Sequence, residues 1–276
     1  MKKSIVWLAS YPKSGNTWTR IFLANYLMNA KEPMKINQIH RFGIGDSVGK
    51  TYRMIGGVDA NLASIDVTLD LRPKVLRGIV ANNADVNLVK THNIRGKAYG
   101  HTLIPEGLTR SAVYIMRNPL DVVVSYARHF GKTVEETVEA LSSSDNAAPA
   151  APTTVHQFFG SWSEHVNSWT SKSSYPQLVL RYEDLHHDPH ESFGRLVKHL
   201  GLPVDKERLD RAIRFSSFKE VQKQEETKGF IESSDHKVKF FAKGQEGQWR
   251  DELSPKLIKR VKKDHRKVME KYGYLE

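Results

Sequence analysis

Short apolar segments of this chain end in basic side chains that can do chemistry. Lys13 follows the first such segment, His92 a second and Arg117 a third. Lysine and arginine side chains bind the oxygens of phosphate and sulfate groups through charge-assisted hydrogen bonds. A histidine titrates near neutrality, so it can accept a proton from a hydroxyl without large tuning of its pKa. These residue types suit an anionic ligand and a proton acceptor.

The first basic residue lies in the loop YPKSGNTW, residues 11–18, which joins an apolar segment to a helical pattern. A glycine-containing loop that enters a helix presents unpaired backbone N–H groups to an anion. Lys13 adds a positive charge, and Ser14, Asn16 and Thr17 add hydrogen-bond donors. A Lys-Ser-Gly string alone would fit a capped turn with a surface lysine, but the full loop predicts phosphate binding.

The loop resembles the 5′-phosphosulfate loop of sulfotransferases that use 3′-phosphoadenosine 5′-phosphosulfate (PAPS), both cytosolic-type enzymes and bacterial small-molecule enzymes. That family usually has threonine where this chain has Asn16. The string KTH at 90–92 resembles the segment that holds the family's general base, which implies this role for His92. The resemblance implies that Lys13 and Lys90 stabilise charge during sulfuryl transfer.

A second signature, RNPLDVVVSY at 117–126, resembles the family's 3′-phosphate site. There an arginine and a serine eight residues later bind the phosphate, which implies this role for Arg117 and Ser125, and we count Ser125 with the catalytic residues. The spacing places Ser125 on the helix that follows the strand, and Arg117 offers a planar fork for phosphate oxygens.

Three later segments support the resemblance: LRYEDL at 180–185, FSSFKE at 215–220 and the lid-like FFAKGQEG at 240–247. The family's lid usually has arginine where this chain has Ala242, so one cationic contact to the 3′-phosphate should be missing. The resemblance implies PAPS as sulfuryl donor, PAP as product and these donor-binding residues: Lys13, Ser14, Gly15, Asn16, Thr17, Trp18, Arg117, Ser125, Tyr182, Ser216, Phe218, Phe241, Lys243 and Gly244.

Strands are predicted at 5–10, 86–89, 112–116 and 177–182, and helices between them at 17–29, 119–130 and 154–170. This alternation favours the α/β class, with a central parallel sheet flanked by helices and ligands bound beyond the carboxyl ends of the strands. Residues 40–58 are predicted as a loop, 60–83 as two helices broken near Pro73, and 254–271 as a basic terminal helix. We expect one domain over 1–276, with a flexible loop at about 142–153 and a lid at about 225–250.

An alternative function is that of a P-loop-like kinase or nucleotide hydrolase. The segment GIGDSVGKT at 43–51 resembles a Walker A loop. That motif needs four residues between its glycines, whereas this segment offers five or three. His186, His187, Asp188 and His190 suggest a metal site, but they lack a second cluster of fixed spacing. We expect a solvated loop there and no metal.

The composition of the chain excludes several other kinds of site and partner. The chain has 276 residues, 39% of them hydrophobic, a net charge of +11 and no cysteine. Disulfides, thiolate zinc sites and cysteine nucleophiles are therefore excluded. The basic stretch 256–271 lacks interleaved aromatic residues, so no specific nucleic-acid partner is expected. No segment approaches the ~20 apolar residues of a membrane span, and we expect a cytoplasmic protein. The expected partner is a small acceptor with a hydroxyl or amine, and the oligomeric state stays open.

Overall fold

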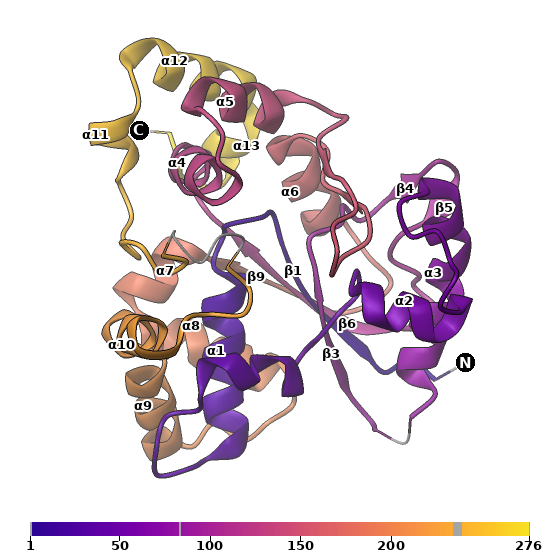
Figure 1. The fold of residues 1–276 in the computed structure, drawn as a ribbon. Coiled ribbons are helices and arrows are strands. Elements are labelled where there is room, and N and C mark those ends of the chain that lie inside the picture. Colours follow the sequence, from indigo (N-terminus) through magenta and orange to yellow (C-terminus); the bar gives the residue numbers. More distant parts are fainter. Residues whose placement is uncertain (1, 83, 234–238, 276) are drawn as a thin grey trace. The chain divides into compact units, whose positions relative to one another are not determined.

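The structure is a computed structural model that describes residues 2–82, 84–233 and 239–275 (Figure 1). Its residues form two compact units. Unit 1 consists of Met1–Tyr11, Gly43–Tyr114 and Ala140–Val179, and unit 2 of Pro12–Phe42, Ile115–Glu139 and Leu180–Glu276. The chain therefore passes from unit 1 to unit 2 directly after the first strand, between Tyr11 and Pro12. The expected extent of a single domain, 1–276, stays a prediction.

A five-stranded sheet has the order β2-β3-β1-β6-β9 (Figure 1). Its strands are β1 (Ile5–Ser10), β2 (Ile44–Gly45), β3 (Asn87–Thr91), β6 (Thr109–Met116) and β9 (Gln177–Arg181). Strand β3 pairs in parallel with both β1 and β2. Every residue of β1 is buried, as expected for a central strand of a parallel sheet covered on both faces. Parallel strands alternate with helices along the chain, so the predicted α/β class is confirmed.

Unit 1 also contains α2 (Gly49–Gly56), α3 (Ile65–Val80), α6 (Trp162–Thr170) and the short strands β4 (Lys97–Ala98), β5 (His101–Thr102), β7 (Ala147–Ala148) and β8 (Gln157–Phe158). The predicted loop at 40–58 is wrong, because part of it forms β2 and α2. The predicted break at Pro73 is also wrong. Pro73 lies inside one continuous helix, which the burial of Leu69, Leu76 and Ile79 holds in place.

Helix α6 begins at Trp162, later than the predicted start at 154. Ser161 and Glu164 form a capping box, in which each side chain accepts a hydrogen bond from the other's backbone N–H. Gly160 has a φ of 66°, a left-handed conformation that separates β8 from this cap. The local signals for the helix start were therefore present in the sequence.

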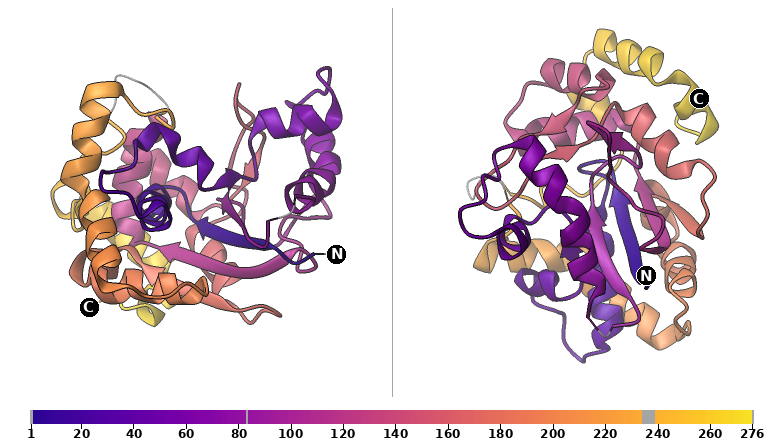
Figure 2. Two further views of the ribbon diagram at one scale, coloured as in Figure 1. Left: turned by 90° about the horizontal axis from the view of Figure 1, so that it is seen from below. Right: turned by 90° about the vertical axis from the view of Figure 1, so that its right-hand side faces the viewer.

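The helices of unit 2 are α1 (Asn16–Met28), η1 (Ile36–Arg41), α4 (Pro119–Phe130), α7 (Tyr182–His187), α8 (Pro189–His199), α9 (Lys206–Phe215), α10 (Phe218–Lys228), α11 (Trp249–Glu252), α12 (Pro255–Asp264) and α13 (Arg266–Lys271). Helix α5 (Val134–Ser142) begins in unit 2 and ends in unit 1. Within unit 2, α9 packs against α1, α8 and α10, and Figure 2 shows these helices from two further directions.

Two predictions for unit 2 need adjustment. The expected terminal helix at 254–271 is two helices that meet at His265, whose side chain is buried. Helix α10 extends to Lys228, so the first residues of the expected lid are helical, and 234–238 lie outside the described residues. No helix within 2–82, 84–233 or 239–275 is long and apolar enough to cross a membrane.

Candidate active site

The loop between β1 and α1 has the backbone of an anion-binding turn. Lys13 has a φ of 68° and Gly15 a φ of 100°, both in the left-handed region. Alternation of left- and right-handed residues turns successive N–H groups toward one point, where an anion can bind. A Cβ at Gly15 would lie 2.7 Å from the Tyr182 ring, so only glycine fits this close approach.

Arg117 joins this loop to Tyr182 and to the segment at 240–247 of unit 2. One Nη donates to the carbonyl of Lys13 at 3.2 Å, and the other donates to the carbonyl of Gln245 at 2.9 Å. The guanidinium also lies 4.2 Å from the centroid of the Tyr182 ring. Arg117 is 5% exposed, so its charge is held in a largely desolvated position. The Arg117 guanidinium therefore contacts both Lys13 and Tyr182.

Two buried polar atoms of these segments lack a partner among the described residues. They are Oγ of Ser14 and Nε of Arg117. Buried polar groups are nearly always hydrogen-bonded, and leaving one unpaired costs about 1–3 kcal/mol. Oxygens of a bound phosphate would accept from both atoms, so the loop and Arg117 fit the phosphate groups of a PAPS-like ligand.

The aromatic residues among the predicted donor-binding residues also come together in unit 2. Trp18 donates its indole N–H to the carbonyl of Ser216 at 2.8 Å. The Phe218 ring covers Gly244 so closely that a Cβ there would lie 2.0 Å from it. Phe218 and Phe241 have ring centroids 6.3 Å apart. The last two predicted segments, 215–220 and 240–247, therefore pack on each other.

His186 is a member of this aromatic group that sequence reasoning missed. Its ring centroid lies 4.6 Å from that of Trp18 and 4.7 Å from that of Tyr182. The predicted loop is wrong at His186, which is half-buried on α7, whereas His187, Asp188 and His190 are exposed as predicted. The position of His186 four residues after Tyr182 was the available signal, because such residues share a helix face. No group of three or more His, Asp and Glu in the part of the chain described could hold a metal ion.

Three further predicted donor residues, Thr17, Ser125 and Lys243, contact carboxylates or line a pocket. Thr17 donates to Glu232 at 3.3 Å, and Lys243 pairs with Glu252 at 3.1 Å. Ser125 lies on α4 and lines a small pocket together with Lys13. Unit 2 thus contains all fourteen predicted donor-binding residues, whereas the predicted base and Lys90 belong to unit 1.

In unit 1 the ring of His92 is oriented by the end of β1. Its Nδ1 lies 2.8 Å from the carbonyl oxygen of Ser10 and 3.2 Å from the Ser10 hydroxyl. A carbonyl oxygen can only accept, so Nδ1 carries the proton and Nε2 keeps its lone pair. Strands β1 and β3 are parallel and pair Ala9 with Thr91. The residues that follow these two, Ser10 and His92, therefore lie side by side. This tautomer makes Nε2 the proton-accepting atom.

Helix α6 holds the backbone on either side of this ring. Nε2 of His165 donates to the carbonyl of His92 at 3.0 Å, and Nε1 of Trp169 donates to the carbonyl of Asn93 at 3.0 Å. Because the His92 carbonyl can only accept, Nε2 of His165 carries the proton, and Nδ1 of His165 accepts from the hydroxyl of Tyr114 at 3.0 Å. Sequence reasoning missed both ring donors, although their spacing of four residues on an amphipathic helix was visible.

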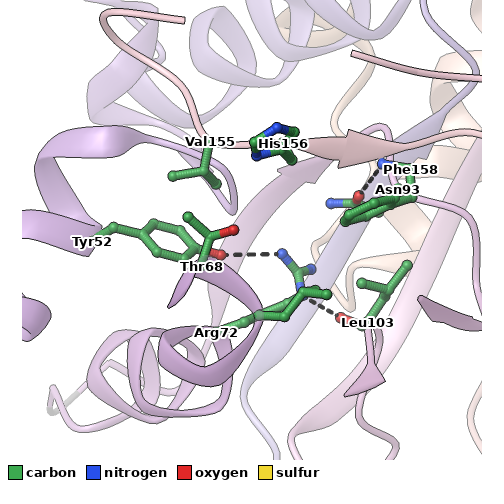
Figure 3. A pocket seen from close by; sticks show the side chains of 9 residues that line it. Tyr52, Thr68, Arg72, Asn93, Leu103, Val155, His156 and Phe158 are labelled. Carbon is green, nitrogen blue, oxygen red and sulfur yellow. Dashed lines mark hydrogen bonds between the residues drawn. The ribbon is translucent and has the colours of Figure 1, made fainter. Parts of the chain in front are cut away.

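Asp46, inside the segment that resembles a Walker A loop, fixes the same strand end from another side. Its Oδ2 accepts from Arg72 at 2.6 Å, from Thr91 at 2.7 Å and from Asn93 at 3.0 Å. Arg72 also donates to the carbonyl of Leu103 and the hydroxyl of Tyr52 (Figure 3). Both members of the ion pair are about 2% exposed. Asp46 therefore belongs to a buried structural network in unit 1.

Burial, together with the nearby charge of Lys90, lowers the pKa of His92 to about 3. The near-neutral pKa expected from the residue type is therefore wrong for the folded protein. Burial also lowers the pKa of His165 to about 3. Both imidazoles are neutral at pH 7, so Nε2 of His92 holds a lone pair across the neutral range.

These buried neutral histidines predict a loss of stability in mild acid. In the unfolded chain a histidine titrates at about 6.5, so below that pH the unfolded state binds more protons than the folded state. Their stabilisation is complete above about pH 6.5 and is lost as the pH falls toward 3, at about 1.4 kcal/mol per pH unit for each histidine.

Urea unfolding followed between pH 7.5 and 5 measures this slope. The variant H165Q should have a shallower slope than the unmodified protein, because one of the buried imidazoles is gone. A free energy of unfolding that stays constant over this range would contradict the neutral burial of these rings.

Comparisons with known proteins place the chain among sulfotransferases. Residues 3–273 match the family model described as the sulfotransferase domain. Sulfotransferase 1 family member D1 of Mus musculus is 25% identical over 95% of this chain and 82% of its own length. Flavonol 4′-sulfotransferase of Flaveria chlorifolia is 24% identical over 94% of this chain and 77% of its own.

Two solved structures share the fold. Mouse sulfotransferase SULT7A1 complexed with PAP superimposes with a TM-score of 0.63 and 19% identity, over 98% of this chain and 86% of that one. Retinol dehydratase in a complex with retinol and PAP gives a TM-score of 0.66 and 20% identity, over 98% and 82%. These likenesses confirm the α/β architecture with its central parallel sheet.

Proposed function

The chain belongs to the sulfotransferase domain family and is an enzyme of sulfuryl transfer, and on this premise we propose that its donor is PAPS. The proposed acceptor is the hydroxyl of a small molecule, or an amine. The reaction is an in-line displacement in which the acceptor oxygen forms a bond to sulfur as the bond from sulfur to the phosphate oxygen breaks. The desulfated donor, 3′-phosphoadenosine 5′-phosphate (PAP), leaves as product.

The observation that carries this proposal is the arrangement around the phosphate loop. The left-handed backbone at Lys13 and Gly15 suits a ligand with several anionic oxygens, and so do Ser14 Oγ and Arg117 Nε, which are buried without a partner among the described residues. Trp18, Tyr182 and His186 supply ring surfaces for a purine. Such a combination of two phosphate-binding elements and an aromatic cluster matches an adenosine bisphosphate.

In this proposal the chain's own residues perform three tasks. His92 accepts the acceptor's proton at Nε2, whose lone pair the Ser10 carbonyl preserves. Lys13 stabilises the charge that develops on the leaving phosphate oxygen, and Lys90 stabilises the sulfuryl oxygens. Arg117 and Ser125 hold the 3′-phosphate and so orient the donor. Ser10 precedes Lys13 by only three residues, so a single chain segment orients the base and begins the phosphate loop.

Calorimetric titration with PAP, 5′-AMP and ATP, without magnesium, tests the donor assignment. We expect PAP to bind more than about tenfold more tightly than 5′-AMP, because a charge-assisted hydrogen bond contributes about 1.5–3 kcal/mol. A preference for ATP that requires magnesium would favour the kinase or nucleotide hydrolase alternative. Absence of PAP binding would overturn the proposal.

The segment at 43–51 offers little support for that alternative, because Asp46 is committed to a buried network and Lys50 is exposed on α2. The cytoplasmic location, the absence of a metal requirement and the acceptor stay predictions. The match to the sulfotransferase domain family determines none of these three properties.

A further inference from the structure

We propose that Arg128 binds the 3′-phosphate of the donor and supplies the cation that Ala242 does not. This inference rests on the proposed function and adds a residue to it, since neither the motifs nor the comparisons assign Arg128 a role. Four features of unit 2 support it: a helix face, a pocket, a pair of hydrogen bonds and a link to Arg117.

Arg128 shares one face of α4 with Ser125 and Asp121. The three residues are separated by four and then three positions, a spacing that aligns side chains along a helix. The Asp121 carboxylate accepts from the backbone N–H groups of Gly247 at 2.7 Å and Trp249 at 3.3 Å. These two bonds attach the end of the expected lid to the face that presents Ser125 and Arg128.

A pocket of unit 2 opens beside this face. Among its lining residues are two lysines, an arginine and a histidine, and no carboxylate belongs to the described lining. The lining residues are Lys13, Ser125, Arg128, His129, Ser233, Lys239, Phe240 and Ala242. Lys239 pairs with Glu226 and Arg128 with Glu252, two carboxylates outside this lining, and a phosphate monoester would add an anionic partner within it. Ala242 contributes no charge, so Arg128 is the arginine of this pocket.

Arg128 is oriented toward the lid residues and keeps donors for a ligand. One Nη donates to Oε1 of Gln248 at 3.0 Å, and the other pairs with the Glu252 carboxylate. A guanidinium has five N–H donors, of which these contacts use two. The side chain is 32% exposed, so a ligand can reach it. Glu252 also pairs with Lys243, and it therefore holds two cations at the end of the lid.

The two arginines, Arg117 and Arg128, are linked through the same segment. The Gln245 carbonyl accepts from Arg117 at 2.9 Å and from the side-chain amide of Gln248 at 2.7 Å. Gln248 in turn accepts from Arg128. Ligand contacts at either arginine are therefore coupled by direct hydrogen bonds, as expected for one subsite with two cations.

The test compares R128Q with the unmodified enzyme by calorimetry against PAP and 5′-AMP. Because only PAP carries a 3′-phosphate, R128Q should weaken PAP binding by about ten- to a hundredfold and 5′-AMP binding by less than about twofold. R128K keeps the charge but loses the planar fork, so its PAP affinity should fall between the two. The matched control is R266Q, which removes the same charge from an exposed arginine on α13.

The outcomes separate this inference from the proposed function. If the unmodified enzyme favours PAP over 5′-AMP and R128Q keeps that ratio, the assignment of Arg128 is wrong and the function stands. Equal weakening of both nucleotides also overturns it, since that result indicates a structural role. If the unmodified enzyme shows no preference for PAP, the proposed function itself fails.

A second variant keeps the test decisive if R128Q does not fold. E252Q retains Arg128 and Lys243 but removes the carboxylate that pairs with both. It should tighten PAP binding by a few fold at low salt and leave 5′-AMP binding unchanged. An unchanged ratio of the two affinities in E252Q would count against a 3′-phosphate contact at Arg128.

Discussion

The variant H92A is expected to turn over about 100- to 10,000-fold more slowly than the unmodified enzyme, the range by which a positioned general base accelerates a reaction. Its PAP affinity should change by less than about twofold, because the donor-binding residues are a separate set in unit 2. The expected loss is large because the proposed mechanism transfers the acceptor's proton to Nε2 of His92, the ring nitrogen that keeps its lone pair.

Initial rates with saturating PAPS, together with PAP titration of the same variant, check this result. H40A is a suitable control, because it removes an exposed histidine outside the described network. Added imidazole should restore part of the turnover of H92A if the missing group is a base. Turnover that survives in H92A would remove this histidine from the mechanism.

The variant D46A is expected to lower the free energy of unfolding by about 3–5 kcal/mol, the cost of removing one partner of a buried ion pair. It leaves the Arg72 guanidinium buried without its carboxylate, and it removes an acceptor from Thr91 and Asn93. The Asp46 carboxyl has a lowered pKa, because the neighbouring guanidinium and the hydrogen bonds outweigh the opposing effect of burial. The charged pair is therefore the folded form at neutral pH.

Urea unfolding at pH 7.5 measures this loss. D70N is the control, because Asp70 is an exposed carboxylate of the same unit and its replacement should change stability by less than about 0.5 kcal/mol. The double variant D46A/R72M should recover part of the lost free energy of unfolding, because it also removes the guanidinium that D46A leaves without its carboxylate. A loss below about 1 kcal/mol in D46A would show that Arg72 finds other partners at little cost.

Most of the residues predicted to bind the donor were proposed from local sequence signals. The loop at 11–18 combines a strand end, a glycine and a helix start within eight residues, and the structure has the left-handed turns that such a loop needs. Helix α4 has its predicted extent, 119–130, with Asn118 as its cap and Pro119 in its first turn. The prediction at Pro73 was wrong because packing of the buried face keeps the helix continuous. The predicted start of α6 was wrong because a capping box begins the helix later in the chain.

The sequence by itself therefore determined the α/β class, the glycine-containing loop at 11–18 and the strand ends that present His92 and Arg117, because the interactions responsible act over a few neighbouring residues. Only the tertiary structure decided the environment of these groups. The bonds from Asp46 to Thr91 and from Arg117 to Gln245 span 45 and 128 residues. The lowered pKa of His92 likewise depends on burial by distant segments. Burial and long-range pairing depend on how the helices and strands pack against one another. The spacing of residues within one segment does not predict this packing.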